Sequence, residues 1–298
     1  MLGHRKPLTI IQYNTNNSRN GVLLHFLQEA EQVDPQPDIL AVQEPWRKDQ
    51  GNTTCTTKSY HLVHAGVGNT RVCFYVNKAI DINKWAPTHH SADTCTIKLE
   101  GRERTIQIHN IYNPRQTNSS LRGIPELLRT EGEHILLGDF NLHHPFWGGV
   151  AVTSADDAAD GLIRATEAAG LSLATEAGME TWAKGTSRST LDLVFTSPWI
   201  TNRLLQSQRQ DRWHTGSDHF PITTEIDIEA PEGPPPPRRP LWKKADWKVV
   251  RSELEGQLQP LHSLPCDTRD ELDALAEAIQ QAIENTIAKT IPSARPSL

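Results

Sequence analysis

An aspartate and an asparagine two residues apart follow a short apolar run near the middle of the chain. The run His134-Ile135-Leu136-Leu137 is closed by Gly138-Asp139-Phe140-Asn141, which is typical of a buried strand that ends at a sheet edge. Residues two apart on an extended strand point the same way. Asp139 and Asn141 would therefore place an anionic acceptor beside an amide, a pair suited to holding a water molecule next to a phosphate and taking its proton. A strand-end aspartate also commonly caps a turn, so the neighbouring motifs must decide.

Five other apolar segments carry polar side chains at or near one end. They are 9–14, 38–45, 109–114, 191–195 and 216–222, and their polar residues are Asn14, Glu44, Tyr112, Asp192 and the pair Asp218-His219. Enzymes of the α/β class commonly build their sites from the ends of several strands. We therefore expect the six segments to meet at one site.

Helical patterns alternate with these strands. Ser18 is typical of a helix N-cap, and the apolar residues of 21–30 form a stripe at helical spacing. Asp156 is similarly placed to cap a helix that runs to about Glu167, with Gly170 as its stop. Further apolar runs indicate a meander of strands near 60–64, 71–76, 94–99 and 104–112. This order predicts an α/β fold in which two mixed β-sheets pack as a four-layer α/β sandwich with outer helices.

A Pro-rich segment follows residue 228. Residues 229–242 include Pro234-Pro235-Pro236-Pro237, typical of a stiff polyproline-like spacer. Residues 243–298 carry apolar side chains at helical spacing, namely Leu272, Leu275, Ala276, Ile279, Ala282, Ile283 and Ile287. A tail this short buries little core alone, so its stripe either folds back or belongs against a neighbour. We expect a main domain at 1–228, a linker at 229–242 and a helical tail at 243–298.

The chain resembles the endonuclease/exonuclease/phosphatase family in the order and spacing of its motifs. The matching residues are Asn14, Glu44, Tyr112, Gly138-Asp139-Phe140-Asn141, Asp192 and Ser217-Asp218-His219. Each motif is weak alone, whereas six in this order are specific. The resemblance covers residues 8 to about 228 and implies the same four-layer fold.

Shorter stretches resemble the apurinic-type endonuclease domain of non-LTR retrotransposons. They are Gln12-Tyr13-Asn14, Gln43-Glu44-Pro45-Trp46, 71–78 and 141–148. In repair-type apurinic endonucleases an aspartate usually stands where this chain has Asn16, a departure that favours the mobile-element branch and puts one metal-shell carboxylate in doubt.

The resemblance implies an endonuclease that depends on Mg²⁺, with Mn²⁺ able to substitute, and that leaves a 3′-hydroxyl and a 5′-phosphate. Its nick in double-stranded DNA would prime reverse transcription. The partners implied are that DNA, a covalently linked reverse transcriptase toward which the tail leads, and, indirectly, the element RNA. No polymerase motif occurs in these residues.

The residue types fit that chemistry, which needs a nucleophilic water, a cation for the developing charge and help for the leaving alkoxide. Glu44 is the expected Mg²⁺ ligand because hard divalent cations take carboxylate oxygens, and Asn14 and Asp218 would complete the metal set. Each also has an ordinary structural interpretation. Glu44 precedes Pro45 and is typical of a turn, and Asn14 could satisfy backbone groups.

Five further residues are expected to act on the phosphate. Asp139 would orient or deprotonate the attacking water, and Asn141 would fix that water or the scissile phosphate. Asp192 would hold His219 in one tautomer and favour its protonated form, which would face a non-bridging oxygen. Tyr112 would donate a hydrogen bond near the phosphate or leaving group, with an interface aromatic as the alternative.

Basic and hydroxyl residues beside the strand ends are expected to contact DNA. They are Arg115, Thr181, Arg188, Ser189 and Thr190. For any one of them, ordinary surface polarity is the competing interpretation.

The composition and net charge of the chain argue against several other classes of protein. The 298 residues carry a net charge of −6, which argues against a nonspecific nucleic-acid coat protein. No apolar run approaches the roughly 20 residues of a membrane span, and no apolar segment typical of a secretory signal precedes the first strand. We expect an intracellular protein with no membrane partner, nuclear when it acts. The four cysteines lie far apart, which favours reduced thiols without structural zinc.

Two other functions remain open on these residues. One is a different phosphoesterase on the same scaffold, acting on abasic DNA, an inositol phosphate or a phospholipid headgroup. The other is an inactive interaction module in which the linker and tail are the working part.

Overall fold

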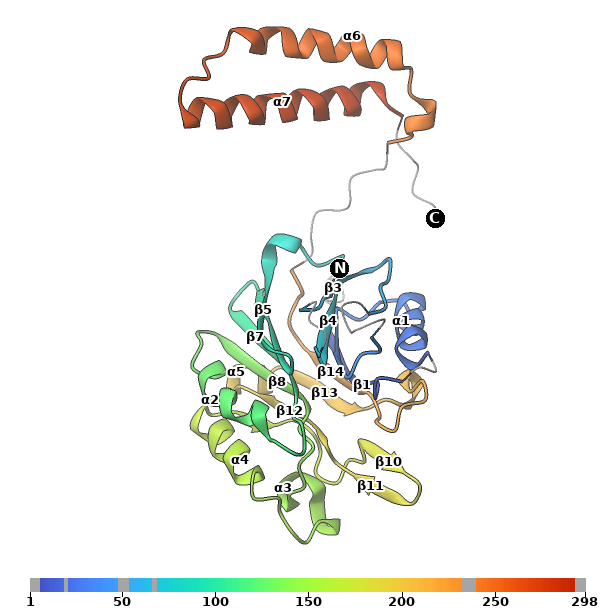
Figure 1. Ribbon diagram of the computed structural model, residues 1–298, viewed down its shortest axis with the longest axis vertical. Coiled ribbons are helices and arrows are strands. Elements are labelled where there is room, and N and C mark those ends of the chain that lie inside the picture. Colours follow the sequence, from blue (N-terminus) through green and yellow to red (C-terminus); the bar gives the residue numbers. More distant parts are fainter. Residues whose placement is uncertain (1–5, 19–20, 48–53, 66–68, 232–239, 293–298) are drawn as a thin grey trace, which may run out of the picture. The chain divides into compact units, whose positions relative to one another are not determined.

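The computed structural model describes residues 6–18, 21–47, 54–65, 69–231 and 240–292. The chain divides into two units, Met1–Pro234 and Pro235–Leu298 (Figure 1). Residues 232–239, most of the predicted linker, lie outside the described residues. The domain limits drawn from the sequence therefore stay a prediction.

Two six-stranded sheets form the first unit. The first sheet has the order β13 (Leu204–Arg209), β14 (Ile222–Ile226), β1 (Leu8–Asn14), β2 (Ile39–Gln43), β4 (Val72–Asn77) and β3 (Tyr60–Val63). The second has the order β5 (Trp85–Ser91), β6 (Thr94–Glu100), β7 (Thr105–Tyr112), β8 (Glu133–Asp139), β12 (Asp192–Thr196) and β9 (Ser172–Leu173). Among the described strands, β1 with β2 and β7 with β8 pair in parallel and the other pairs are antiparallel, so both sheets are mixed.

The two sheets pack face to face over one apolar core. Alternate residues of each strand point inward, and Ile10, Phe74, Ile108 and Leu137 are buried in that shared core. The α/β class and the two-sheet sandwich predicted from the sequence are confirmed.

Helices cover the outer faces and complete four layers (Figure 1). The apolar face of α1 (Val22–Gln32) packs on the outer face of the first sheet, where Phe26 meets Tyr13. On the second sheet, α2 (Ile124–Leu127) and α4 (Ala159–Ala168) cover Leu136 and Phe195. Shorter elements are α3 (Pro145–Gly148), α5 (Pro198–Thr201), η2 (Ile82–Lys84), η3 (Ser119–Gly123), η4 (Gly149–Ala151) and η5 (Asp211–Trp213).

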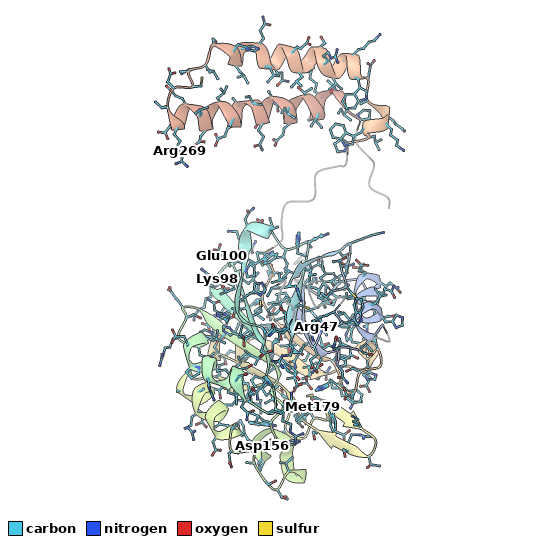
Figure 2. The ribbon with its side chains drawn as sticks, viewed as in Figure 1. Arg47, Lys98, Glu100, Asp156, Met179 and Arg269 are labelled. Atoms are coloured by element: carbon cyan, nitrogen blue, oxygen red, sulfur yellow. The ribbon has the colours of Figure 1, made fainter. Side chains whose placement is uncertain are left out.

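Both helix caps predicted from the sequence are wrong. Helix α1 begins after Gly21, which takes the N-cap position with φ 79°, and no side chain caps that helix. Ser18 lies three residues too early. The N-cap of α4 is Ala158, because the Asp156 carboxylate accepts the backbone N–H of His143 at 2.7 Å instead. Asp156 is labelled in Figure 2.

The predicted meander is present, with one strand that the sequence concealed. The strands expected near 60–64, 71–76, 94–99 and 104–112 correspond to β3, β4, β6 and β7. Strand β5 was missed because its seven residues, Trp85 to Ser91, are nearly all exposed and show no apolar alternation.

Gly138 permits a close approach between β8 and β7 of the second sheet. It pairs with Ile111 on β7 and has φ +148°, a region that residues with a Cβ rarely adopt. A Cβ built on Gly138 would lie 1.9 Å from the Ile111 carbonyl oxygen. The residue before Asp139 must therefore be glycine for β8 to reach this position.

The second unit is a helical hairpin. It consists of η6 (Trp242–Lys244), α6 (Trp247–Leu258), η7 (Gln259–Ser263) and α7 (Arg269–Thr290). A reciprocal capping box between Thr268 and Glu271 fixes the start of α7, and Lys289 pairs with Glu253 across the hairpin at 2.8 Å. Nowhere in the described part of the chain is a helix both long and apolar enough to span a bilayer.

Candidate active site

The predicted residues meet because two parallel strand pairs end at one edge of the sandwich. Asn14 ends β1, Tyr112 ends β7 and Asp139 ends β8, while Glu44 directly follows β2 with φ 46°. Strand β12 runs the other way, so its first residue, Asp192, pairs with Asp139. Asp218 and His219 precede β14.

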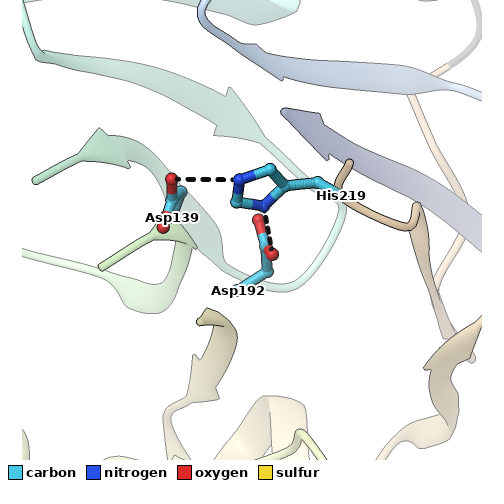
Figure 3. Close-up of side chains that lie close together, drawn as sticks. All are labelled: Asp139, Asp192 and His219. Carbon is cyan, nitrogen blue, oxygen red and sulfur yellow. Dashed lines mark hydrogen bonds and ion pairs between the residues drawn. The ribbon is translucent and has the colours of Figure 1, made fainter. Parts of the chain in front are cut away.

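His219 lies between two buried carboxylates that come from the second sheet (Figure 3). Its Nδ1 atom is 2.8 Å from Oδ2 of Asp192, and its Nε2 atom is 3.8 Å from Oδ2 of Asp139. All three side chains are buried. Because Nδ1 donates to Asp192, the remaining ring nitrogen faces Asp139 and the site.

Asp192 is held in place from two further directions. Gln12, on β1, donates its amide to the other carboxylate oxygen at 3.2 Å. The Thr181 hydroxyl accepts the backbone N–H groups of Leu191 and Asp192, both at 2.9 Å. The carboxylate that orients His219 is thus itself oriented by two buried polar side chains.

Two amides surround Asp139. Asn14 donates Nδ2 to Oδ2 of Asp139 at 2.9 Å, and Asn141 donates Nδ2 to the same oxygen at 3.0 Å. Asn141 also donates its backbone N–H to Oδ1 and Nδ2 to the Asn113 carbonyl. A carbonyl only accepts, so this contact fixes the amide orientation and leaves Oδ1 of Asn141 as an acceptor for another molecule.

Burial and mutual charge set the protonation of this group. Burial raises the pKa of Asp139 to about 7, although the charge of His219 and the two amides act against that rise. Burial alone would lower the pKa of His219, but the surrounding Asp192, Asp139 and Asp218 together raise it to about 10. His219 is therefore the charged partner near neutral pH.

Tyr112 keeps its proton at any working pH. Burial, followed by the charges of Glu44 and Asp139, raises the pKa of its phenol far above its usual value. The guanidinium of Arg71 lies 5.1 Å from the ring centroid and pairs with Asp93 at 2.5 Å. Tyr112 can thus act only as a neutral hydrogen-bond donor beside two carboxylates.

The donor set fits a hard divalent cation. Glu44 and Asp218 are partly exposed, and neither forms an ion pair with a basic side chain of the described chain. Asn14 lies 3.5 Å from Glu44, and Asn16 donates to Asp218 at 2.9 Å. Carboxylates without a basic partner are ligands that Mg²⁺ takes. Asn14 and Asn16 present their Nδ2 groups to these carboxylates, and Oδ1 of Asn14 accepts the Asn16 backbone N–H at 2.8 Å. The Asp139–Asp192–His219 group is less suited, because His219 already donates to one carboxylate and faces the other.

The segment that carries Asp218 and His219 is fixed by a buried tyrosine. The Tyr13 hydroxyl accepts the backbone N–H groups of Thr215 and Ser217 at 3.2 and 3.3 Å. Ser217 donates its own hydroxyl to the Asn14 carbonyl at 2.8 Å and accepts the His219 N–H. These contacts tie the segment to the end of β1.

A stack of side chains supports the same segment. The guanidinium of Arg209 lies 3.4 Å from the centroid of Phe220, whose ring stacks on His214 with centroids 4.8 Å apart. His214 in turn bonds to the Ser217 carbonyl at 2.8 Å.

The predicted DNA-contact residues divide into two groups. Thr181 and Thr190 are buried and bond to the backbone, Thr190 to the Met179 carbonyl at 2.6 Å, so the structure argues against DNA contact by these hydroxyls. Arg115 and Arg188 are exposed. Arg188 lies with the half-buried Ser189 on β11 (Ser187–Ser189), which pairs with β10 (Trp182–Lys184) in a hairpin.

Sequence reasoning missed Gln12, Tyr13 and the structural role of Thr181. Gln12 and Tyr13 belong to a strand, and to a stretch that resembles retrotransposon endonuclease domains, but the sequence assigns neither side chain a role in the site. Their partners lie 180 to 204 residues away in the chain, and no local pattern signals such contacts. A polar residue inside an otherwise apolar strand, as Gln12 is, would have been the one available signal.

Comparisons with known proteins agree with this geometry. A family model described as endonuclease-reverse transcriptase matches residues 106–223. No curated protein matches the chain.

Several solved structures share the fold. The endonuclease domain of TRAS1, a telomere-specific non-LTR retrotransposon, has a TM-score of 0.58 at 16% identity, covering 74% of this chain and 99% of that one. The 3′ phosphatase NExo from Neisseria, bound to a product DNA hairpin, has a TM-score of 0.58 at 17% identity, with coverage of 74% and 99%. An AP endonuclease from Archaeoglobus fulgidus has a TM-score of 0.54 at 16% identity, with coverage of 74% and 100%.

Proposed function

We propose that the chain is a member of the endonuclease/exonuclease/phosphatase family and acts as a metal-dependent endonuclease that hydrolyses phosphodiester bonds in DNA, since a family model described as endonuclease-reverse transcriptase matches residues 106–223. The observation that carries the proposal is the buried Asp139–His219–Asp192 group beside the uncompensated carboxylates of Glu44 and Asp218. A base, a positioned cationic side chain and a cation site within one strand-end edge are the parts that this reaction requires.

Asp139 serves as the general base. A carboxylate with its pKa raised to about 7 is half-ionised near neutral pH, which suits proton transfer from water better than an ordinary aspartate does. The free Oδ1 of Asn141 is positioned to accept a hydrogen bond from that water. The proton then passes to Asp139 as the water oxygen attacks phosphorus.

Charge that develops on the phosphate meets two donors. His219, held protonated by Asp192, donates from Nε2 toward a non-bridging oxygen, and Tyr112 donates from its neutral phenol near the phosphate or the leaving oxygen. Both donors are fixed before substrate arrives, so they cost little reorganisation during the reaction. These roles account for why Asp192 needs the additional support of Gln12 and Thr181.

Glu44, Asn14 and Asp218 would hold Mg²⁺, or Mn²⁺ in its place. When bound, the cation supplies Lewis-acid stabilisation of phosphate charge and of the leaving alkoxide. The fit rests on the donor types and on the absence of a basic partner for Glu44 and Asp218 among the described residues.

A more specific proposal concerns the products of DNA cleavage and how they are used. We propose that the products are a 3′-hydroxyl and a 5′-phosphate, and that the 3′ end primes reverse transcription by a linked polymerase. The endonuclease-reverse transcriptase model that matches residues 106–223 supports this proposal, as does the fold shared with the TRAS1 endonuclease domain.

The test is nicking of supercoiled plasmid by the full chain in Mg²⁺ or Mn²⁺, with EDTA as the metal-free arm. Asp139→Ala and His219→Ala should each abolish nicking while the protein stays folded. His61→Ala is the matched control, because His61 lies on β3 and contacts Trp85 rather than the site. Extension of the nicked ends by a DNA polymerase would establish the 3′-hydroxyl.

Three parallel substrates separate the alternatives. Cleavage of an abasic oligonucleotide without nicking of intact plasmid would indicate a repair-type nuclease, and phosphate release from an inositol phosphate would indicate a small-molecule phosphoesterase. If folded wild-type protein cleaves none of them in either metal, the enzymatic proposal fails.

A further inference from the structure

Two exposed tryptophans stack at the start of the helical hairpin. Trp242 lies in η6 and Trp247 begins α6, with ring centroids 6.2 Å apart and planes within 9°. Their side chains are 48% and 59% exposed. Tryptophans usually bury most of their surface, so a pair held parallel and left in water indicates a surface made for contact.

Basic side chains without ion-pair partners in the described part of the chain lie close in sequence to the two tryptophans. Lys243, Lys244, Lys248 and Arg251 are all exposed, and none forms an ion pair with any residue in the described part of the chain. The acid within this stretch, Asp246, is occupied as the N-cap of α6, where it accepts the N–H of Lys248 at 3.0 Å.

The same stretch borders a depression on the helix surface. A pocket of about 300 Å³ is lined by Trp247, Lys248, Arg251, Ser252 and Glu255. Two of its five lining side chains are cationic, one is aromatic and one, Glu255, is acidic.

From these contacts we propose that Trp242–Arg251 is a binding site for single-stranded nucleic acid. Every nucleobase has a π-face that can stack on an exposed indole, and a base freed from its partner strand exposes that face. The four cations beside the indoles can contact phosphates of the same strand. The site is independent of the proposed nuclease chemistry, since no catalytic residue belongs to the hairpin.

The chemistry favours a nucleic-acid strand over an anionic membrane surface. A helix that lies on a bilayer needs a broad apolar face opposite its charged face. Here the exposed apolar residues within the stretch are Trp242, Trp247 and Val249. Lysines lie between them in the sequence, at positions 243, 244 and 248. Aromatic and cationic residues in alternation are typical of a groove that follows one strand.

The experiment measures anisotropy of fluorescein-labelled 20-nucleotide dT and rU strands with the full chain in EDTA. The double variant Trp242→Ala/Trp247→Ala should weaken binding at least about tenfold, because loss of one base–aromatic stack costs about 5- to 150-fold. Trp242→Phe/Trp247→Phe should retain most of the affinity, since phenylalanine also stacks. Tighter binding of rU would assign the site to RNA, and equal or tighter binding of dT to single-stranded DNA.

A charge variant tests the phosphate contacts separately. Lys243→Gln/Lys244→Gln should reduce the slope of log affinity against log salt by about 1.4, the value expected for two contacts to a single strand. The matched control, Lys84→Gln/Lys98→Gln, removes two lysines of the catalytic unit and should leave affinity and slope unchanged.

Two results would overturn the inference. In the first, the Trp242→Ala/Trp247→Ala variant binds both the dT and the rU strand with an affinity within twofold of the wild-type protein. In the second, the tryptophans are needed for binding to phosphatidylglycerol vesicles but not to either strand. Neither depends on plasmid nicking, so failure here is distinct from failure of the nuclease proposal.

Discussion

Nδ1 of His219 lies 2.8 Å from Oδ2 of Asp192, and both side chains are buried. A buried imidazole that donates to a carboxylate is held in one orientation, and its charged form is favoured over the neutral form. The contact explains why a histidine remains protonated in an enclosed site and why it presents Nε2 toward Asp139.

Asp192→Asn should lower kcat by about 10²- to 10⁴-fold, the range for loss of a positioned acid–base group. An amide fills the same space but provides no charge to favour the imidazolium. The measurement is initial nicking rate against DNA concentration, and we expect kcat rather than KM to change. Asp156→Asn is the control because Asp156 also contacts a histidine, His143, at 3.2 Å. Equal losses in both variants would contradict the proposed role.

Tyr13→Phe should impair catalysis although Tyr13 touches no substrate. The substitution leaves the N–H groups of Thr215 and Ser217 without their buried acceptor, which costs about 1–3 kcal/mol of stability and loosens the segment that carries His219. Tyr75→Phe is the control, since the Tyr75 hydroxyl donates to the Cys55 carbonyl at 2.7 Å. Urea unfolding should show destabilisation in both variants, with reduced kcat only for Tyr13→Phe.

Gly138→Ala should destabilise the fold by several kcal/mol. Overpacking and a strained φ each contribute about 1–3 kcal/mol, and the added Cβ would meet the Ile111 carbonyl. Gly161→Ala is the matched comparison, because Gly161 is in α4 with nothing within 4 Å of its added Cβ. That change should stabilise by about 0.5–1 kcal/mol. Urea midpoints that shift equally would refute the close-approach argument.

A chain of hydrogen bonds connects three histidines of the second sheet, His90, His109 and His134. His134 donates Nε2 to the Thr130 carbonyl at 3.0 Å, so its Nδ1 accepts from Nε2 of His109 at 3.0 Å. Nδ1 of His109 then accepts the Thr96 hydroxyl at 2.8 Å, and Thr96 accepts Nε2 of His90 at 2.9 Å. The two contacts in which a ring nitrogen accepts require His109 and His134 to be neutral.

This chain of hydrogen bonds predicts lower stability in mild acid. Burial, then the charges of His134 and His90, lowers the pKa of His109 to about 3 from 6.5. Between those values the unfolded chain binds more protons, so stability is present above pH 6.5 and is lost as pH falls. His109→Gln cannot titrate and should reduce the pH slope of unfolding free energy by up to about 1.4 kcal/mol per unit. Identical slopes by urea unfolding at pH 7 and 4.5 would contradict this account.

The site was largely predictable from the sequence because its members lie in short motifs at strand ends. Asp139 ends β8, whereas Asp192 opens β12 and His219 precedes β14, and these two strands run antiparallel to β8 and β1, so all three residues reach the same edge of the sandwich. Their assigned roles in catalysis stay predictions, although the structure places them in contact.

What the sequence concealed depends on contacts between distant segments. Ser18 and Asp156 have the residue types of helix caps, yet Gly21 and Ala158 hold those positions, because Asp156 finds a tertiary partner in His143. Tyr13 resembles any core aromatic until its hydroxyl is seen beside a segment about 200 residues later. Propensity describes local preference, and tertiary bonding overrides it.

The group around His219 is assembled across the interface between two layers. Asn14 and Gln12 come from the first sheet, whereas Asp139 and Asp192 come from the second, and His219 enters from the segment before β14. Neither sheet with its covering helix therefore constitutes a functional half. Catalytic activity therefore depends on how the two sheets are aligned. A small shift of one sheet against the other would abolish activity even if each sheet kept its own structure.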